Sequence, residues 1–274
     1  MQRVLLTGAS GGIGTRLRTL LPPHYPRLRL SDIKAPEDLR PEEEFVAADL
    51  ADMAQVERAV EGMDGIIHMG GFSVEGPWET ILAANIAGTY NLFEAARRKG
   101  VKRVVFASSN HVVGFYPRDQ RLTTDVTALP DTRYGVSKAC GEAIGALYAY
   151  KFGLNVLCLR IGNVDDAPRD VRKLSIWLKP EDLVQLICIG LEHPDLRYEI
   201  FYGASDNARA WWDNAVAYRY GYKPSGDSES LLEVAFQGQT QLRADHVGDY
   251  YQGGPFASQE FEGGLERAPE GKVR

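Results

Sequence analysis

RVLLTGASGGIG, residues 3–14, is the stretch that decides the fold of this chain. Its first part, Arg3–Thr7, is a short aliphatic run typical of a buried strand. Glycines follow at once, and residues 15–21 then have the pattern of a helix. A helix that begins directly after such a turn presents unpaired N–H groups and a partial positive charge. The stretch therefore predicts a strand, turn and helix that together bind an anion.

The spacing of the glycines and one later acid indicate which anion. Gly8, Gly11 and Gly14 are spaced G-x-x-G-x-x-G, one step different at the first glycine from the common dinucleotide fingerprint. Asp32 ends a second predicted strand, residues 28–31, about 20 residues beyond the glycines. A carboxylate there accepts the hydroxyls of an adenosine ribose and repels the additional phosphate of NADP. The alternative, an acid that only begins a turn, leaves the order of these features unexplained.

A second motif covers the same residues. Gly8 to Gly12 also matches G-x-S-x-G, the turn that presents a nucleophilic serine, here Ser10, in α/β hydrolases. That interpretation requires an acid and a histidine at strand ends near Ser10. It has no use for Asp32 or for the third glycine, so the sequence favours dinucleotide binding.

Composition limits the other classes of function. A chain of 274 residues suits one α/β domain, and a net charge of −6 provides no basic surface for nucleic acid. No apolar run reaches the length of a membrane span, so we expect no membrane partner. The three cysteines form no C-x-x-C pair, and we expect no signal peptide before the first strand. We expect a cytoplasmic protein without a metal site.

Strand and helix patterns alternate along the chain, which predicts a doubly wound parallel sheet of the Rossmann kind with right-handed crossovers. We expect residues 1–161 to form a dinucleotide-binding domain. Residues 162–274 would form a small substrate-binding portion of the same domain, and the segment after Gly238 has no predicted structure. Further strands are predicted at residues 44–47, 65–69, 104–107, 155–161 and 198–202, and helices at residues 54–60, 77–99, 134–152, 180–192 and 228–236.

Chemistry is expected where predicted strands end, because ligands of such sheets bind at that edge. Gly70-Gly71 follows one strand, and Ser108-Ser109-Asn110-His111 follows the next. Tyr134 and Lys138 are four residues apart and therefore share one helix face. His68 lies within a strand and is interpreted as a hydrogen-bonded core residue.

These features together resemble the extended short-chain dehydrogenase/reductase superfamily over roughly the first 160 residues. Within that superfamily the chain is similar to the uronate dehydrogenases. The first resemblance is carried by Thr7, Gly8, Gly11, Gly14, Asp32, Asp49, Gly70, Gly71, Asn85, Ser109, Tyr134 and Lys138. The second is carried by residues 106–111, 134–138, 160–162, 203–205 and 211–214.

The resemblance implies oxidation of a hexuronic acid, glucuronate or galacturonate, at its anomeric carbon, with NAD as cofactor and an aldarolactone as product. Tyr134 would remove the proton, Lys138 would favour the phenolate and hold the nicotinamide ribose, and Ser109 would hold the reacting oxygen. A free tyrosine has a pKa of about 10, so action near pH 7 needs about 4 kcal/mol of differential stabilisation.

The same resemblance assigns the binding residues. The cofactor would be held by Gly8, Gly11, Gly12, Ile13, Gly14, Asp32, Asp49, Leu50, Gly70, Gly71, Asn85, Tyr134 and Lys138. The sugar would be bound by Ser73, Ser109, Asn110, His111, Tyr134, Asn163 and Arg172.

Two of these assignments need comment. Arg172 would bind the substrate carboxylate, for which the planar guanidinium fork is suited. Without the resemblance, the sequence favours a solvated loop charge for Arg172, beside Arg169 and Lys173. Asn163 stands where the family carries serine, and either side chain can hydrogen-bond a sugar.

Two other functions remain open from the sequence. A nucleotide-sugar epimerase or dehydratase uses the same Tyr and Lys but returns the hydride, and it needs a larger C-terminal lobe for the nucleotide. A non-catalytic NAD sensor has no need of Tyr134 with Lys138. We also expect self-association into a homo-oligomer.

Overall fold

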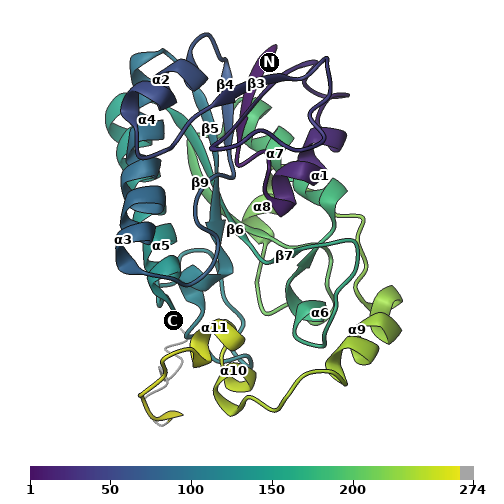
Figure 1. The fold of residues 1–274 in the computed structure, drawn as a ribbon. Helices are drawn as coiled ribbons and strands as arrows, with labels where there is room; N and C mark the ends of the chain where they lie inside the picture. Colours follow the sequence, from purple (N-terminus) through teal and green to yellow (C-terminus); the bar gives the residue numbers. More distant parts are fainter. Residues whose placement is uncertain (266–274) are drawn as a thin grey trace.

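A seven-stranded parallel sheet forms the centre of the computed structural model, which describes residues 1–265 (Figure 1). The order of its strands is β3-β2-β1-β4-β5-β6-β9, so the predicted doubly wound parallel sheet is confirmed. The strands are β1 (Arg3–Thr7), β2 (Arg27–Asp32), β3 (Glu44–Ala47), β4 (Gly65–His68), β5 (Arg103–Ser109), β6 (Asn155–Ile161) and β9 (Tyr198–Gly203).

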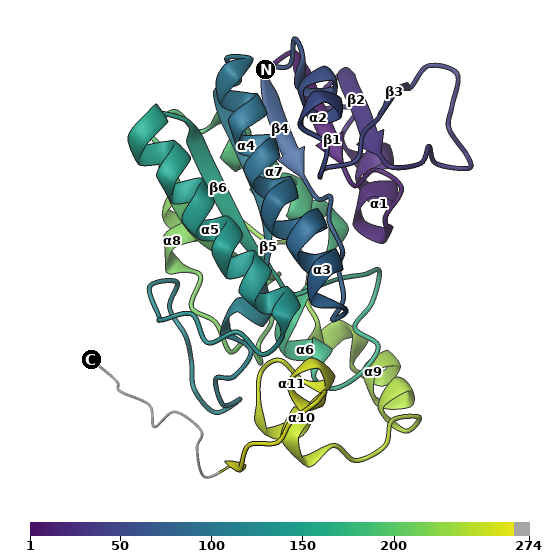
Figure 2. The same cartoon turned by 60° about the vertical axis from the view of Figure 1, so that its left-hand side comes forward.

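Helices cover both faces of the sheet, as Figures 1 and 2 show. One layer contains α1 (Gly12–Leu20), α7 (Pro180–Glu192) and α8 (Ala215–Arg219), and the other contains α2 (Met53–Val60), α4 (Gly88–Arg98) and α5 (Arg133–Phe152). Successive strand residues point to opposite faces, so Val4 and Leu6 enter the first core while Leu5 enters the second. Burial on both faces explains the continuous aliphatic run at β1.

The helix predicted over residues 77–99 consists of three consecutive helical segments of different geometry. It begins as α3 (Trp78–Ile81), widens into a π-helical turn (Leu82–Ala87) and continues as α4. Asn85 lies in the wide turn, and its amide accepts from Phe72 N at 2.7 Å and donates to Phe72 O at 2.9 Å. The irregular turn therefore marks the place where this helix holds the loop after β4.

The C-terminal portion adds both to the sheet and to its carboxyl edge. Strand β9 pairs with β6, and α7 packs against the same core. The other elements cap the edge: β7 (Asn163–Val164), α6 (Lys173–Ile176), β8 (Trp177–Leu178) and α9 (Leu232–Gln239), which a 3-10 turn (Glu229–Leu231) precedes. Two-residue strands and a four-residue helix carry no periodicity, so the sequence did not predict them.

The segment after Gly238 is ordered as far as the structure describes it. It contains α10 (His246–Tyr250) and α11 (Pro255–Ser258), and Tyr251 forms a β-bridge with Pro117. This segment is ordered by contacts with a loop that is distant in sequence. Its own sequence has no pattern that predicts the two helices. Residues 266–274 of the predicted C-terminal portion lie outside the described residues. Among residues 1–265, no helix combines the length and the apolar character of a membrane span.

Gly14→Ala and Gly12→Ala form a matched test of the packing at β1 and α1. A methyl at Gly14 would overlap the carbonyl oxygen of Gly8, whereas a methyl at Gly12 meets no atom within 4 Å. We expect Gly14→Ala to lose about 2 kcal/mol of stability and about 5 °C in Tm, and Gly12→Ala to melt like the wild type. Thermal unfolding of the three proteins measures this, and equal melting of both variants would contradict it.

Candidate active site

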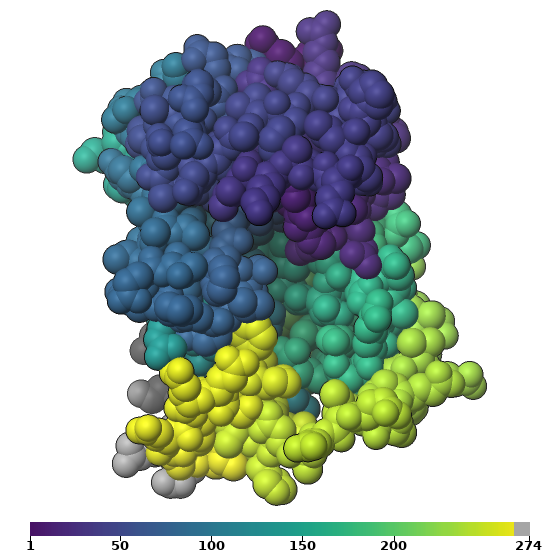
Figure 3. Space-filling model, viewed as in Figure 1, coloured from purple at the N-terminus to yellow at the C-terminus, as the bar shows by residue number. Residues whose placement is uncertain are grey.

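A cavity of about 1050 Å³ opens at the carboxyl edge of the sheet. Figure 3 shows the surface hollowed there, between the N-terminal half and the yellow and green C-terminal segments. Its walls come from the ends of β5 and β6, the start of α5, the loop that carries Arg172, and the segment after α9. Segments far apart in the sequence thus build one site.

The turn between β1 and α1 forms a cradle of main-chain groups. Gly8 has a positive φ of +70°, and a side chain there would lie 2.7 Å from Gly70 N, so only glycine fits. Gly11 precedes α1 without any side-chain cap, which leaves the first N–H groups of the helix for a ligand. Asp32 accepts from Ser10 N at 3.0 Å, so its carboxylate lies beside the cradle.

The hydrolase interpretation of this turn is not supported by its geometry. The Ser10 hydroxyl donates to the main-chain carbonyl of Lys34 at 2.7 Å and is exposed. His68 is buried within β4, where its Nδ1 lies 2.8 Å from Thr7 Oγ1. Burial lowers the pKa of His68 to about 3, so it is a neutral core residue, as the sequence predicts.

The remaining predicted cofactor residues fall into two groups. Ile13 and Gly71 line the cavity, and Gly70 N donates to Thr7 Oγ1 at 3.1 Å beside them. Asp49 and Leu50 follow β3, where Asp49 Oδ1 accepts from Ala51 N at 2.9 Å.

Asn85 differs from these residues because protein groups accept both of its amide N–H bonds. Besides its two bonds to Phe72, it donates to Ser137 Oγ at 3.0 Å. The structure thus places Asn85 behind the loop that follows Gly71, where it fixes the shape of that loop.

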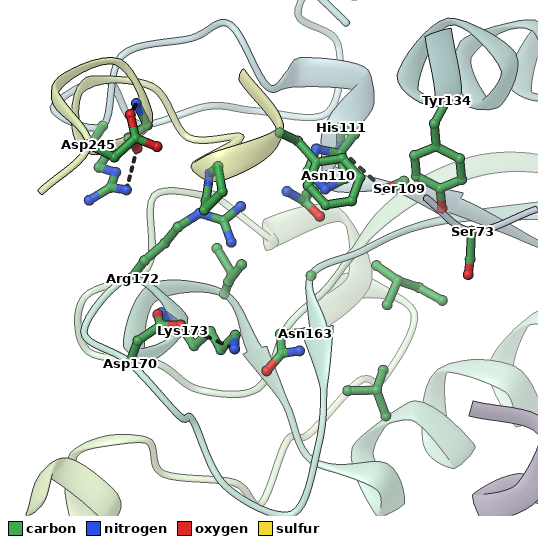
Figure 4. Close-up of a pocket in the computed structure, with 18 of the residues that line it drawn as sticks. Ser73, Ser109, Asn110, His111, Tyr134, Asn163, Asp170, Arg172, Lys173 and Asp245 are labelled. Atoms are coloured by element: carbon green, nitrogen blue, oxygen red, sulfur yellow. Dashed lines mark hydrogen bonds and ion pairs between the residues drawn. The ribbon is translucent and has the colours of Figure 1, made fainter. Parts of the chain in front are cut away.

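Tyr134 and Ser109 lie together in the cavity (Figure 4). Lys138 also lines it, from the helix face that it shares with Tyr134, as their spacing predicts. Thr132 caps α5 by accepting from Gly135 N at 2.9 Å, which places Tyr134 in the first turn. Lys138 Nζ donates to Ala107 O at 2.8 Å and lies 5.6 Å from the centre of the Tyr134 ring. The helix cap and the strand end together fix this arrangement.

Burial opposes the charged forms of both α5 residues. It raises the pKa of Tyr134 to about 12, against the lowering effect of the Ser109 hydroxyl, and it lowers the pKa of Lys138 to about 8. Ionisation of Tyr134 near pH 7 therefore needs about 7 kcal/mol, more than the 4 kcal/mol expected from a free tyrosine. A bound cation beside the phenol is the natural source of the difference.

His111 has a partner that sequence reasoning missed. Its Nδ1 lies 2.8 Å from Asp131 Oδ2, and the Asp131 side chain is fully buried. The imidazole stacks on Phe256 with ring centres 4.1 Å apart. No partner for Nε2 is found within residues 1–265, so this nitrogen is left for a ligand. Asp131 is 20 residues from His111 in the chain and follows a proline, which in sequence indicates only a loop.

Arg172 is a partly buried cation that forms no ion pair in the part of the chain that the structure describes. Its Nε and Nη2 donate to Gln252 O at 3.0 and 2.7 Å. The Asn110 amide fits its surroundings when its oxygen accepts from Arg172 Nη2 at 3.3 Å and its nitrogen donates to Ile161 O. Burial, with a contribution from Arg118, lowers the pKa of Arg172 to about 10. An anion in the cavity would neutralise this charge.

The neighbouring cations of this loop, unlike Arg172, form ion pairs with acidic side chains. Arg169 pairs with Asp165 at 2.8 Å and is 69% exposed, and Lys173 pairs with Asp170 at 3.1 Å. The interpretation as a solvated loop charge thus fits Arg169 but not Arg172.

Asn163 and Ser73 complete the predicted set. Asn163 Oδ1 is buried without a hydrogen-bond partner in the described chain, and the residue lines the cavity. Figure 4 shows Ser73 and Tyr134 toward one end and Arg172 toward the other, with Asn163 between them. Sequence reasoning missed the C-terminal wall, which is formed by Gln239, Leu242, Arg243, Ala244, Asp245, Gly248, Asp249, Pro255 and Phe256.

Comparison with known proteins agrees with this geometry. A model of the NAD dependent epimerase/dehydratase family matches residues 4–169. The chain belongs to this family. It is 46% identical to the uronate dehydrogenase of Pseudomonas putida, over 93% of this chain and 95% of that protein.

Solved structures give the same result. The glucuronic acid dehydrogenase of Chromohalobacter salexigens is 44% identical, with a TM-score of 0.89 over 93% of this chain and 96% of that one. A mutant uronate dehydrogenase of Agrobacterium tumefaciens, complexed with NAD, is 41% identical, with a TM-score of 0.90 over 94% and 97%. The similarity therefore covers nearly the whole chain of each relative.

The lowered pKa of Lys138 predicts a pH-dependent stability. Between its folded pKa of about 8 and its usual 10.5, the unfolded chain binds the proton more strongly. The contribution of Lys138 to the free energy of unfolding therefore rises across this interval, by about 3 kcal/mol in all. Urea unfolding of wild type and Lys138→Met from pH 7.5 to 10.5 measures it. We expect the free energy of unfolding of the wild type to rise with pH relative to that of the variant. Parallel curves of stability against pH would exclude the lowered pKa of Lys138.

Proposed function

We propose that this protein oxidises a hexuronic acid, glucuronate or galacturonate, at its anomeric carbon and reduces NAD to NADH. The observation that carries the proposal is Arg172, a partly buried cation that forms no ion pair among residues 1–265, in the cavity that also contains Tyr134 and Ser109. The product is the aldarolactone, formed when C1 loses a hydride and its hydroxyl loses a proton.

The cradle between β1 and α1 fits the cofactor. Its uncapped helix start suits the pyrophosphate, and Asp32 suits the hydroxyls of the adenosine ribose. Gly71 and Ile13 extend this surface into the cavity. Bound NAD supplies the hydride acceptor and a positively charged ring.

Three side chains of this protein do the work at the reacting carbon. Tyr134 takes the proton of the anomeric hydroxyl, and Ser109 holds the oxygen that loses it. Lys138 favours the phenolate through its positive charge and is placed to hold a ribose. Because burial raises the pKa of Tyr134 to about 12, the phenolate forms only when positive charge surrounds it.

The carboxylate end of the substrate is matched by Arg172. A hexuronate carries its carboxylate at the end of the sugar opposite the anomeric carbon. Tyr134 and Arg172 lie toward opposite ends of the cavity, with Asn110, His111 and Asn163 between them (Figure 4). Binding of the carboxylate by Arg172 thus directs C1 toward Tyr134, and the middle residues meet the sugar hydroxyls.

We propose the same division of labour along the chain as the sequence predicts. Residues 1–161 hold the cofactor and the catalytic side chains, and residues 162–274 supply most of the substrate wall. Self-association is supported by exposed apolar side chains on the adjacent helices α4 and α5, including Tyr150 at 78%, Tyr90 and Leu147 (Figure 2). The three unpaired cysteines support a reducing compartment, the cytoplasm.

The deciding experiment is a panel of free sugar acids and neutral sugars with NAD, followed by NADH absorbance. Net NADH with free uronates supports the proposal. An epimerase or dehydratase returns the hydride and accumulates no NADH, and a sensor binds NAD without turnover.

Tyr134→Phe tests the base. We expect a loss of about 10³-fold in kcat, because proton removal has no other acceptor, and an NAD dissociation constant within about twofold of wild type. Steady-state kinetics and NAD titration measure the two quantities. If the variant kept a tenth of the wild-type kcat, Tyr134 would not be the base.

Arg172→Ala tests the carboxylate contact. Breaking a desolvated charge pair costs about 2–5 kcal/mol, so kcat/KM for glucuronate should fall about 30-fold or more. Glucose, which has no carboxylate, should be a poor substrate, and its kcat/KM should change little in the variant. Arg172→Lys should recover part of the loss, since lysine lacks the fork. Unchanged glucuronate kinetics in Arg172→Ala would remove the assignment.

A further inference from the structure

Gln252 is a buried polar residue that the chemistry above does not use. It lies between α10 and α11, in a segment that we call the C-terminal strap, residues 245–258. The Gln252 side chain is completely inaccessible to solvent. A buried amide is unfavourable unless its groups are hydrogen-bonded, so its partners indicate what the residue is for.

The side chain of Gln252 fastens the strap to the body of the protein. Its Nε2 donates to Pro117 O at 3.0 Å and to Gln120 O at 2.8 Å. Its Oε1 accepts from Trp212 Nε1 at 2.9 Å. All the bonds of the amide are therefore made to groups more than thirty residues away in the chain.

The main chain of Gln252 makes a different contact, toward the cavity. Its carbonyl oxygen accepts from both Nε and Nη2 of Arg172, while its N–H donates to Tyr116 O at 2.9 Å. One edge of the guanidinium is thus fixed by the strap. No hydrogen-bond partner for Nη1 is found within the described chain, so the other edge remains for an anion.

The strap is also shaped around Arg172. Gly254 has a φ of +65°, and a side chain there would lie 2.9 Å from Arg172 Cζ. This glycine therefore lets the strap backbone lie against the guanidinium, two residues after the carbonyl that holds it. Two separate features of the strap are adapted to one side chain.

We propose that Gln252 is a positioning residue for carboxylate recognition. Its side-chain amide holds the strap, and its carbonyl aims Arg172 at the carboxylate of the sugar acid. The proposal rests on the proposed function, because it assigns the selectivity for acids partly to the strap. A fork that recognises a carboxylate needs fixed orientation as well as charge, and the carbonyl supplies the orientation.

Gln252→Met tests the proposal, because it keeps the bulk of the side chain and removes its three hydrogen bonds. We expect the ratio of kcat/KM for glucuronate to that for glucose to fall about tenfold, mainly through KM for glucuronate. Trp212→Phe removes the indole N–H from which Oε1 accepts, together with part of a buried ring that stacks on Tyr202, and should give a smaller change in the same direction. It also decides the question if Gln252→Met fails to fold.

Ser258→Ala is the matched control within the strap. Its hydroxyl bonds Asp245 Oδ2 at 2.7 Å and Pro255 O at 3.0 Å and touches neither Arg172 nor Gln252. A cooperative thermal unfolding transition in each variant, above the assay temperature, confirms folding. We expect Ser258→Ala to keep the wild-type substrate ratio, and the same fall in this control would overturn the proposal.

A double variant shows whether Gln252 acts through Arg172. If it does, adding Gln252→Met to Arg172→Ala should change the substrate ratio by less than about twofold. Calorimetric titration of glucuronate into Tyr134→Phe saturated with NAD, with and without Gln252→Met, measures binding apart from turnover. We expect about tenfold weaker binding with Gln252→Met.

Failure of this proposal is distinguishable from failure of the proposed function. If the wild type oxidises no uronate in preference to glucose, the function itself is wrong and the inference falls with it. The other outcome is a wild type that prefers uronates, with Gln252→Met and Trp212→Phe lowering kcat/KM equally for glucuronate and glucose, or for neither. In that case only the role of Gln252 is wrong.

Discussion

The structure depends on one constraint: at the carboxyl end of β1, the backbone of the turn into α1 lies against the backbone that follows β4. Gly8 lies so near the backbone after β4 that a side chain would overlap it, and Gly14 lies equally near Gly8. This approach fixes β1, β4 and α1 relative to one another. It leaves a cradle of main-chain N–H groups at the sheet edge where the neighbouring strands also end. The position of the cofactor relative to Ser109 and Tyr134 follows from that packing.

Burial sets the electrostatics of the site. Tyr134 and Lys138 are buried and Arg172 is partly buried, and for each of them desolvation shifts the pKa against the charged form. Under the proposed function, the ligands bring the complementary charge, a cationic ring beside Tyr134 and an anion beside Arg172. A site of this kind stabilises the charged ligands of the reaction more strongly than water-exposed groups would.

The C-terminal strap, residues 245–258, gives the substrate end of the cavity its shape. Gln252 fixes it to the loop near Pro117 and to Trp212, and Phe256 covers the imidazole of His111. Arg172 and His111 are therefore oriented by one segment although they belong to different loops. The cofactor end, by contrast, is built within the first half of the chain. Substrate preference can thus change through the strap without disturbing the cradle.

The sequence by itself determined the sheet, the glycine cradle, Asp32 and the pairing of Tyr134 with Lys138. These features depend on spacing along one strand or helix, and local geometry converts such spacing directly into position. Tertiary structure decided the rest. Asn85 lies in a π-helical turn that the sequence did not predict, and its amide bonds Phe72 and Ser137. Its role toward the cofactor stays a prediction. Asp131 and Gln252 carry no signal in sequence, because their roles come from contacts 20 and 80 residues away. Whether Arg172 was a solvated loop charge or a side chain held beside the cavity depended on its contact with the strap, since such contacts come from the packing of distant segments and not from the residue.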